Sequence, residues 1–143
     1  MAVTVRPVTR DDLGVCTVLI GQLGYNVDQT EIVQRFAVVE QSAGHQVFVL
    51  DAEGRVVGLV HGFLRPALEK SVEVVVQSLV IAREDRGRGF GQMLMDAIEG
   101  WARSWGVMSV VLASQNTRTA SHAFYERLDY RRMATSHVFR KTL

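Results

Sequence analysis

Hydrophobic residues recur along this chain with two different spacings, and the spacing predicts the secondary structure. Alternation of apolar and polar positions is typical of strands, whereas apolar positions three or four residues apart are typical of helices. Strands are predicted where the first pattern holds, at 3–8, 46–51, 55–64 and 72–82. Helices are predicted where the second holds, at about 10–23, at 28–44 and from Phe90 to a cap at Gly106.

The second half of the chain completes this order of elements. A continuous apolar run at 107–113 predicts a strand buried on both faces. A helix is predicted at 117–128, and one or two closing strands at 130–142. The resulting order is β-α-α-β-β-β-α-β-α-β, which predicts an α/β fold with a mixed central sheet and helices on both of its faces.

Short polar signals mark where two of the helices begin. Thr9 with Asp12, and Asp28 with Glu31, have the three-residue spacing of a helix capping box. The turn at 52–54 joins the strands on either side of it into a hairpin.

Composition narrows the class of protein. A length of 143 residues predicts a single domain over 1–143. The net charge of +1 gives no reason to expect a nucleic-acid partner, and no apolar run reaches the ~18 residues of a membrane span. One cysteine, Cys16, excludes an internal disulfide framework and is compatible with a reducing cytoplasm, which is the predicted location.

A glycine-rich loop lies between the strand at 72–82 and the helix that follows. Residues 86–91 read Arg-Gly-Arg-Gly-Phe-Gly. Glycines let a backbone approach a ligand closely, and the unpaired N–H groups of the first helical turn bind anions. Arg86 and Arg88 add positive charge, so the loop predicts a phosphate-binding cradle, although a tight turn that only needs glycine is the alternative.

The loop does not fit two common nucleotide motifs. A Walker loop ends in Gly-Lys-Ser/Thr, but Gly91 is followed by Gln92 and Met93. A dinucleotide fingerprint needs glycine at position 94, which is leucine, and an acidic residue about 20 positions further on, where 109–113 read Ser-Val-Val-Leu-Ala. A different phosphate- or nucleotide-binding module therefore stays only as an alternative.

The remaining pattern, Arg86-x-x-Gly89-x-Gly91 after a strand, resembles motif A of the GCN5-related N-acetyltransferases (GNAT). The order of elements resembles that family over essentially the whole chain. The resemblance implies that the loop holds the pyrophosphate of acetyl-coenzyme A and that the main chain of Leu79 and Ile81 holds the acetyl carbonyl and pantetheine. The cofactor-binding residues implied are Leu79, Val80, Ile81, Arg86, Gly87, Arg88, Gly89, Phe90, Gly91 and Asn116.

A second segment, 116–130, resembles the Asn-…-Ala-x-x-Phe-Tyr region of the same family. The resemblance implies that Tyr125 protonates the thiolate that leaves when an amine attacks the thioester. Packing of Tyr125 beside Phe124 is the alternative. Asp129 departs from the family pattern, which usually has glycine at this position. Aspartate tolerates the left-handed backbone conformation better than most residues, so the turn is still expected.

The base that accepts the amine proton is less well defined by the sequence. Many family members use a glutamate on the strand before the glycine loop, at a position nearest to Val75 here. Alternation places Glu73, Val75, Gln77, Leu79 and Ile81 on one face. Glu73 is the carboxylate on that face and is the predicted base, and Gln77 is predicted to position a water or the amine. A solvated Glu73 at a strand start, and attack by a neutral amine without a base, stay open.

Acceptor specificity in this family comes from the first two helices and from the loop after the hairpin, here 21–36 and 65–70. Tyr25 and His61 are predicted to contact the acceptor, with packing as the alternative for each. The four histidines lack metal-ligand spacing, so no metal is expected. The C-terminal segment 136–139 suggests a homodimer through strand addition.

The resemblance implies an enzyme that moves acetyl from acetyl-coenzyme A to a primary amine of a small molecule, by direct attack in a ternary complex. Two alternatives remain on the same fold. One is a non-catalytic acyl-coenzyme A sensor, and the other is an N-acetyltransferase of proteins or peptides.

Overall fold

The computed structural model describes residues 2–115 and 117–143, and the chain divides into two compact units. The first unit ends at Leu112 and the second begins at Ala113. None of the helices in the described ranges combines the length and the hydrophobicity that crossing a bilayer requires.

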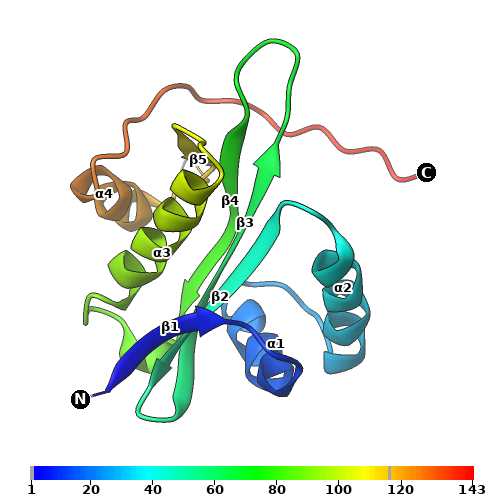
Figure 1. The fold of residues 1–143 in the computed structure, drawn as a ribbon, viewed down its shortest axis with the longest axis vertical. Coiled ribbons are helices and arrows are strands. Elements are labelled where there is room, and N and C mark those ends of the chain that lie inside the picture. Colours follow the sequence, from blue (N-terminus) through cyan, green and yellow to red (C-terminus); the bar gives the residue numbers. More distant parts are fainter. Residues whose placement is uncertain (1, 116) are drawn as a thin grey trace. The chain divides into compact units, whose positions relative to one another are not determined.

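The first unit is built on one five-stranded sheet in the order β1-β2-β3-β4-β5 (Figure 1). The first four strands pair antiparallel with their neighbours, and β5 pairs parallel with β4. The strands are β1 (Val3–Pro7), β2 (His45–Ala52), β3 (Arg55–Arg65), β4 (Glu73–Ile81) and β5 (Val110–Leu112). The mixed α/β sheet predicted from the sequence is therefore confirmed.

Three helices cover the two faces of this sheet. Figure 1 shows α1 (Leu13–Gln22) and α2 (Gln29–Gln41) on one side of β3 and β4, and α3 (Phe90–Ser104) on the other. The predicted caps are present: Asp12 accepts a hydrogen bond from the Thr9 N–H at 2.7 Å, and Asp28 accepts one from the Glu31 N–H at 2.8 Å. A short 3-10 turn at Arg10–Asp12 precedes α1, so the helix predicted from residue 10 starts three residues later.

Two glycines of β3 let α3 lie close against the sheet. A Cβ atom added at Gly58 would lie 3.1 Å from Leu94 Cδ1, and one at Gly62 would lie 2.9 Å from Ile98 Cδ1. Both distances are shorter than ordinary carbon contacts. The apolar stripe of α3 is buried in this packing, at Phe90, Leu94, Met95, Ile98 and Ala102. The face of β3 that carries the two glycines is therefore the α3 face.

A β-bulge in β4 overturns the predicted alternation. Gly62 pairs with Val76 and His61 pairs with Ser78, so Gln77 is an extra residue in β4. The Cβ positions of Gly62 and Gly58 lie beside the side chains of Val74 and Ile81, at 3.6 and 2.6 Å, so both side chains lie on the α3 face. Strict alternation would put these residues, seven apart, on opposite faces. The prediction that Glu73 shares one face with Leu79 and Ile81 is therefore wrong.

The strand predicted at 107–113 is shorter and more exposed than expected. Only Val110–Leu112 pair with β4, and their side chains are half-buried. β5 is the last strand of the described sheet, so one of its edges lacks a neighbouring strand there. The prediction that this strand is buried on both faces is therefore wrong, because the side chains of β5 are half-buried.

The second unit contains α4 (Thr119–Arg127) and an extended C-terminal segment. Asp129 ends the helix with a φ of 68°, so the prediction that aspartate adopts the left-handed conformation here is confirmed. The predicted closing strands are absent, since residues 130–143 form no strand in the described part of the chain. A strand needs a neighbour for its backbone hydrogen bonds, and the secondary structure of this unit is a single helix.

Candidate functional site

The glycine loop forms an open cradle at the start of α3. A 3-10 turn at Arg83–Asp85 leads into Gly87 and Gly89, whose φ angles are 78° and 82°. Both angles lie in the left-handed region, which glycine adopts without strain. A Cβ atom at either glycine would meet nothing within 4 Å. The backbone side of the loop is therefore open, and the N–H groups of the first turn of α3 lie beside it.

A buried carboxylate fixes this loop to the sheet. Asp85 is 3% exposed and accepts two hydrogen bonds from Arg55 at the start of β3, both at 3.1 Å. Arg88 donates a further bond to Asp85 at 3.2 Å, and its guanidinium lies 4.9 Å from the centre of the Phe90 ring. The hydrogen bonds from Arg55 hold the pKa of the Asp85 carboxyl below its usual range.

Asp85 and Arg55 were not predicted from the sequence. An acidic residue directly before the glycine loop was the only signal, and its partner lies 30 residues earlier in the chain. Sequence spacing does not reveal such a pair, because the sheet brings the two residues together.

The end of β4 offers main-chain groups on its free side. The Ala82 N–H donates to the Val57 carbonyl at 2.7 Å, so the alternate residues of β4, Leu79 and Ile81, direct their main-chain groups away from β3. Arg86 Nε donates to the Ile81 carbonyl at 3.0 Å. Pairing with β5 ends at Val76 in the described sheet. The main-chain groups of Leu79 and the N–H of Ile81 thus face the side where the sequence predicted the acetyl group and pantetheine, whereas the Ile81 carbonyl already accepts from Arg86.

Glu73 lies at the other end of β4 in an ionic cluster. Its carboxylate is 3.1 Å from Lys70 Nζ and 3.5 Å from an Arg65 guanidinium nitrogen, and it accepts a hydrogen bond from Ser109 at 3.0 Å. The hydrogen bond from Lys70, followed by that from Ser109, holds the pKa of the Glu73 carboxyl below its usual range. A lowered pKa makes a weaker base, so these surroundings favour a structural role for Glu73 at the β4–β5 pairing.

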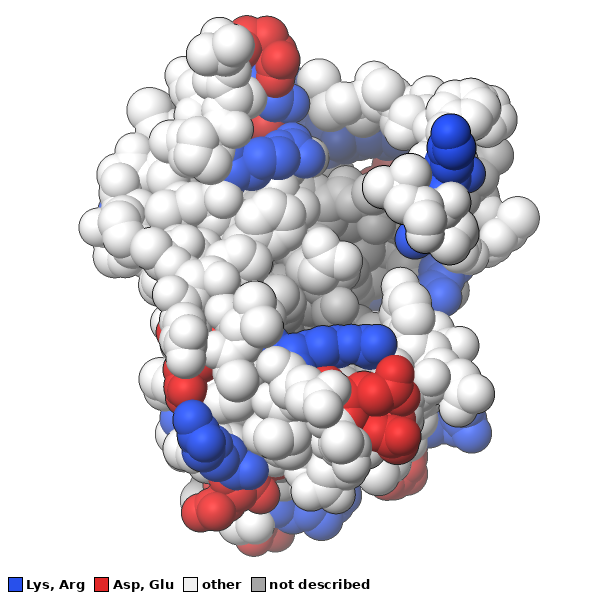
Figure 2. Space-filling view, turned by 90° about the vertical axis from the view of Figure 1, so that its right-hand side faces the viewer, with Lys and Arg blue, Asp and Glu red and all other residues white. Residues whose placement is uncertain are grey.

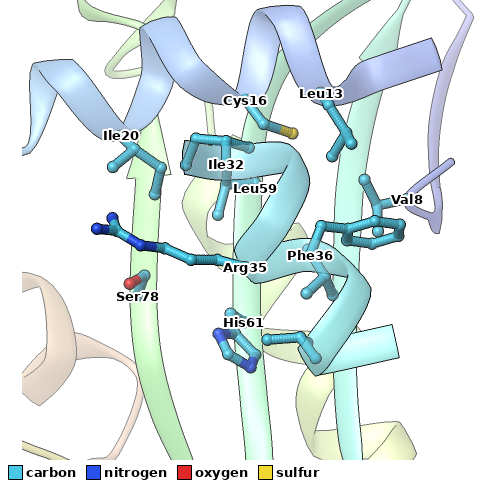
Figure 3. Close-up of a pocket in the computed structure, with 12 residues that line it drawn as sticks. Val8, Leu13, Cys16, Ile20, Ile32, Arg35, Phe36, Leu59, His61 and Ser78 are labelled. Atoms are coloured by element: carbon cyan, nitrogen blue, oxygen red, sulfur yellow. The ribbon is translucent and has the colours of Figure 1, made fainter. Parts of the chain in front are cut away.

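A cavity of about 120 Å³ lies between the α1–α2 pair and the sheet (Figure 3). His61 and Ser78, which pair across β3 and β4, both line it. Its other lining residues come from the position just after β1, from α1 and α2 and from β2 and β3, and nearly all are apolar: Val8, Leu13, Cys16, Ile20, Ile32, Arg35, Phe36, Val39, Val47 and Leu59. The structure therefore brings His61 to a cavity, as the predicted acceptor contact requires.

His61 is uncharged in this position at neutral pH. Its Nε2 lies 3.0 Å from Nδ1 of His45, and His45 also stacks on Phe63. Burial, and to a smaller degree the neighbouring His45, lower the pKa of His61 to about 4. The other two predicted acceptor contacts, Tyr25 and Gln77, do not line the cavity, and Tyr25 is 62% exposed.

Tyr125 lies on α4 in the second unit and is half-buried. Its ring meets Phe124 edge-on at 5.1 Å between centres and Tyr130 at 6.0 Å. Burial raises the pKa of the Tyr125 phenol, so the hydroxyl keeps its proton at neutral pH. The predicted cofactor residue Asn116 lies outside the described residues. Across the ranges that are described, no three histidine, cysteine or acidic side chains are grouped as metal ligands.

Charged side chains of both signs are interspersed on the face seen in Figure 2, which looks from the right-hand side of Figure 1, where α2 lies. Broad uncharged areas separate them, and lysine and arginine do not merge into one large basic area on this face. An extended basic surface of that kind is what steers nucleic acids to a protein.

Known proteins are similar to this chain in sequence or in fold. Residues 18–130 match the profile of the acetyltransferase (GNAT) family. An uncharacterized N-acetyltransferase of Bacillus subtilis is 27% identical over 124 residues, which cover 86% of this chain and 86% of that protein. The solved structure of AAC(6')-Iy in complex with the bisubstrate analogue CoA-S-monomethyl-acetylneamine is similar with a TM-score of 0.89 at 17% identity, over 100% of both chains. Glucosamine-6-phosphate N-acetyltransferase from Arabidopsis thaliana has a TM-score of 0.84 at 17% identity, covering 98% of this chain and 99% of that one.

The profile and the relatives define a transferase of acyl groups. The chain belongs to the acetyltransferase (GNAT) family, as the glycine loop predicted. Its activity is N-acetyl transfer, with acetyl-coenzyme A as the donor.

The residues of the loop fit this donor. Coenzyme A carries a pyrophosphate, and the loop provides open space at Gly87 and Gly89 beside the N–H groups of a helix start. The same space would be filled by any side chain at these two positions. The fit therefore rests on the backbone geometry and adds to the likeness in sequence.

We expect Asp85→Asn to weaken the use of acetyl-coenzyme A without slowing the chemical step. An amide cannot accept both hydrogen bonds from Arg55 and the bond from Arg88, so the loop loses its fixed position. The KM for acetyl-coenzyme A should rise roughly ten-fold or more, because small displacements of a binding group are costly. The kcat at saturation should change little. Steady-state kinetics at varied acetyl-coenzyme A measures both quantities.

Glu84→Gln is the matched control for that variant, because Glu84 is the exposed neighbour of Asp85 and the charge change is the same. Equal effects of the two variants on KM would mean that net charge, and not the position of the loop, sets cofactor affinity.

Proposed function

We propose that this N-acetyltransferase acts on a primary amine of a small molecule and that the amine attacks acetyl-coenzyme A directly in a ternary complex. The observation that carries the proposal is the open glycine loop at the start of α3, next to the part of β4 beyond Val76, where pairing with β5 has ended in the described sheet. Likeness to enzymes whose names include an aminoglycoside derivative and glucosamine-6-phosphate supports a small acceptor.

Each part of the proposed site has a defined task. The backbone of 87–91 and the arginines 86 and 88 hold the pyrophosphate, and the main chain of Leu79 and Ile81 holds the acetyl carbonyl. The nitrogen of the amine forms a bond to the acetyl carbon while the carbon–sulfur bond breaks. Tyr125 then donates its proton to the departing thiolate, for which its protonated state at neutral pH is suited.

The ammonium form must lose one proton to solvent before the attack, and the attacking nitrogen loses a second proton as the amide forms, which restores the Tyr125 phenol directly or through water. The ionic cluster around Glu73 leaves a weak base there, and the imidazole of His61, with a pKa of about 4, is also a weak base. We therefore propose attack by the neutral form of the amine, with His61 and Ser78 as polar contacts of the acceptor. A cytoplasmic location and a homodimer through 136–139 stay predictions from the sequence.

Thermal unfolding with three candidate ligands tests the choice of donor. A ligand present at about 100 times its dissociation constant stabilises the folded state by about 2.7 kcal/mol. Acetyl-coenzyme A should raise the melting temperature, whereas ATP and NAD should not. Stabilisation by ATP alone would contradict the proposal.

A further inference from the structure

The inner face of α2 is apolar but is only partly covered by the rest of the first unit. Ile32, Phe36 and Val39 all line the cavity, yet no residue of α2 is buried. Figure 3 shows Ile32 and Phe36 directed from α2 into the space in front of the sheet. An amphipathic helix normally buries such a face. The cavity therefore lies beside the apolar face of α2, in space that packed side chains would fill in a closed core.

The cavity is lined mainly by apolar side chains. Among the described residues that line it there is no aspartate or glutamate, and the charged one is Arg35, whose guanidinium lies 3.2 Å from the Glu31 carboxylate. The polar groups besides Arg35 and the thiol are His61 and Ser78, which lie together on β3 and β4. A second positive charge on a ligand would find no carboxylate in this lining, whereas a hydrocarbon group would displace water from apolar side chains.

The size of the cavity fits one compact group. Its volume is about 120 Å³. A dry cavity of about 150 Å³ lined by similar residues holds benzene in another protein. A phenyl or branched alkyl group is therefore about the right size.

The cavity also lies next to the place where the acetyl group is expected. Ser78 lines it, and the next residue is Leu79, whose main chain is available on the free side of β4. We propose that the acceptor amine carries a compact apolar group that fills the cavity between α2 and the β3–β4 pair. This inference rests on the proposed function and adds a class of substrate to it: an apolar primary amine, not a polycationic aminosugar or polyamine.

The first test compares 2-phenylethylamine with ethylamine and spermidine as acceptors, using free-thiol release from acetyl-coenzyme A. Burial of a phenyl group should raise kcat/KM for 2-phenylethylamine at least ten-fold above that for ethylamine. Spermidine should be no better than ethylamine. Equal or faster turnover of ethylamine or spermidine would overturn the inference while the transferase activity stands.

A pair of variants on α2 locates the effect. Ile32→Phe places a ring in the space that the phenyl group would occupy and should lower kcat/KM for 2-phenylethylamine to about that for ethylamine. Val33→Phe adds the same ring on the neighbouring residue, which is 44% exposed and does not line the cavity, and it should keep the preference. An unchanged KM for acetyl-coenzyme A in both variants shows that they are folded. A preference that survives in Ile32→Phe would overturn the inference.

Binding separates this inference from the proposed activity. Calorimetric titration of 2-phenylethylamine into the protein with coenzyme A should give heat for the wild type and for Val33→Phe, but not for Ile32→Phe. If this pattern is found without turnover of any amine, the cavity assignment stands and the proposed function fails. No binding to the wild type, or equal binding to all three proteins, would contradict the cavity assignment.

Discussion

Replacing Tyr125 by phenylalanine should lower kcat by a factor of about 10² to 10⁴, the usual contribution of a positioned general acid. The variant loses only the phenol hydroxyl, so the ring contacts with Phe124 and Tyr130 remain. The KM for acetyl-coenzyme A should stay within about two-fold, because Tyr125 is expected to act on the leaving thiolate and not on cofactor binding. Free-thiol release at saturating amine and donor measures the change.

Tyr130→Phe is the matched control, because it removes a phenol hydroxyl from the neighbouring ring of the same unit. It should keep most of the wild-type kcat. An unchanged kcat in Tyr125→Phe would retain the enzyme and remove Tyr125 as its acid. Equal losses in both variants would indicate damage to the packing around α4.

Gly89→Ala should weaken acetyl-coenzyme A binding by about 10- to 100-fold. The φ of 82° costs an alanine about 1–2 kcal/mol, and its Cβ would occupy the open side of the loop where the pyrophosphate is expected. Loss of one hydrogen bond to a charged group costs about 1.5–3 kcal/mol, which corresponds to this range of affinity. Calorimetric titration of acetyl-coenzyme A measures the dissociation constant.

The β2–β3 hairpin supplies a control of the same backbone geometry. Gly54 has a φ of 83°, and an added Cβ there also meets nothing within 4 Å. Gly54→Ala should therefore lower the free energy of unfolding by about the same amount as Gly89→Ala, about 1–2 kcal/mol, and leave cofactor affinity unchanged. If both variants bind acetyl-coenzyme A equally well, the loop does not hold the pyrophosphate.

Local signals predicted those parts of the structure that depend on neighbouring residues. The capping pairs at Thr9–Asp12 and Asp28–Glu31 lie within one helical turn, so their spacing is visible in the sequence. The glycine loop is equally local, because a strand, a run of glycines and a helix follow one another directly. For the same reason the hairpin, the helix start at Phe90 and the left-handed turn at Asp129 were all predicted correctly.

Features that depend on distant partners were missed. The bulge at Gln77 is set by the pairing of β4 with β3, and nothing in the run Val-Val-Val-Gln-Ser-Leu marks it. It moves Glu73 to the face opposite Ile81, so a base predicted by alternation was placed on the wrong face. The Arg55–Asp85 pair and the cavity under α2 likewise arise only when the helices and strands assemble.

The C-terminal residues gave an apolar pattern without a defined partner. Val138 and Phe139, the apolar residues of the segment 136–139 that was predicted to add to a sheet, are 87% and 93% exposed. A periodic pattern predicts how a segment pairs once it has a neighbour, and it does not supply that neighbour.

Amine-dependent acetyl transfer tests the central claim most directly. The purified protein is incubated with acetyl-coenzyme A and a set of primary amines, and both free thiol and acetylated amine are quantified, the latter by mass spectrometry. We predict equal amounts of the two products, in the presence of an acceptor amine only, with 2-phenylethylamine ahead of ethylamine. Tight binding of acetyl-coenzyme A without any acetylated amine across the set would contradict the account and favour a non-catalytic acyl-coenzyme A sensor.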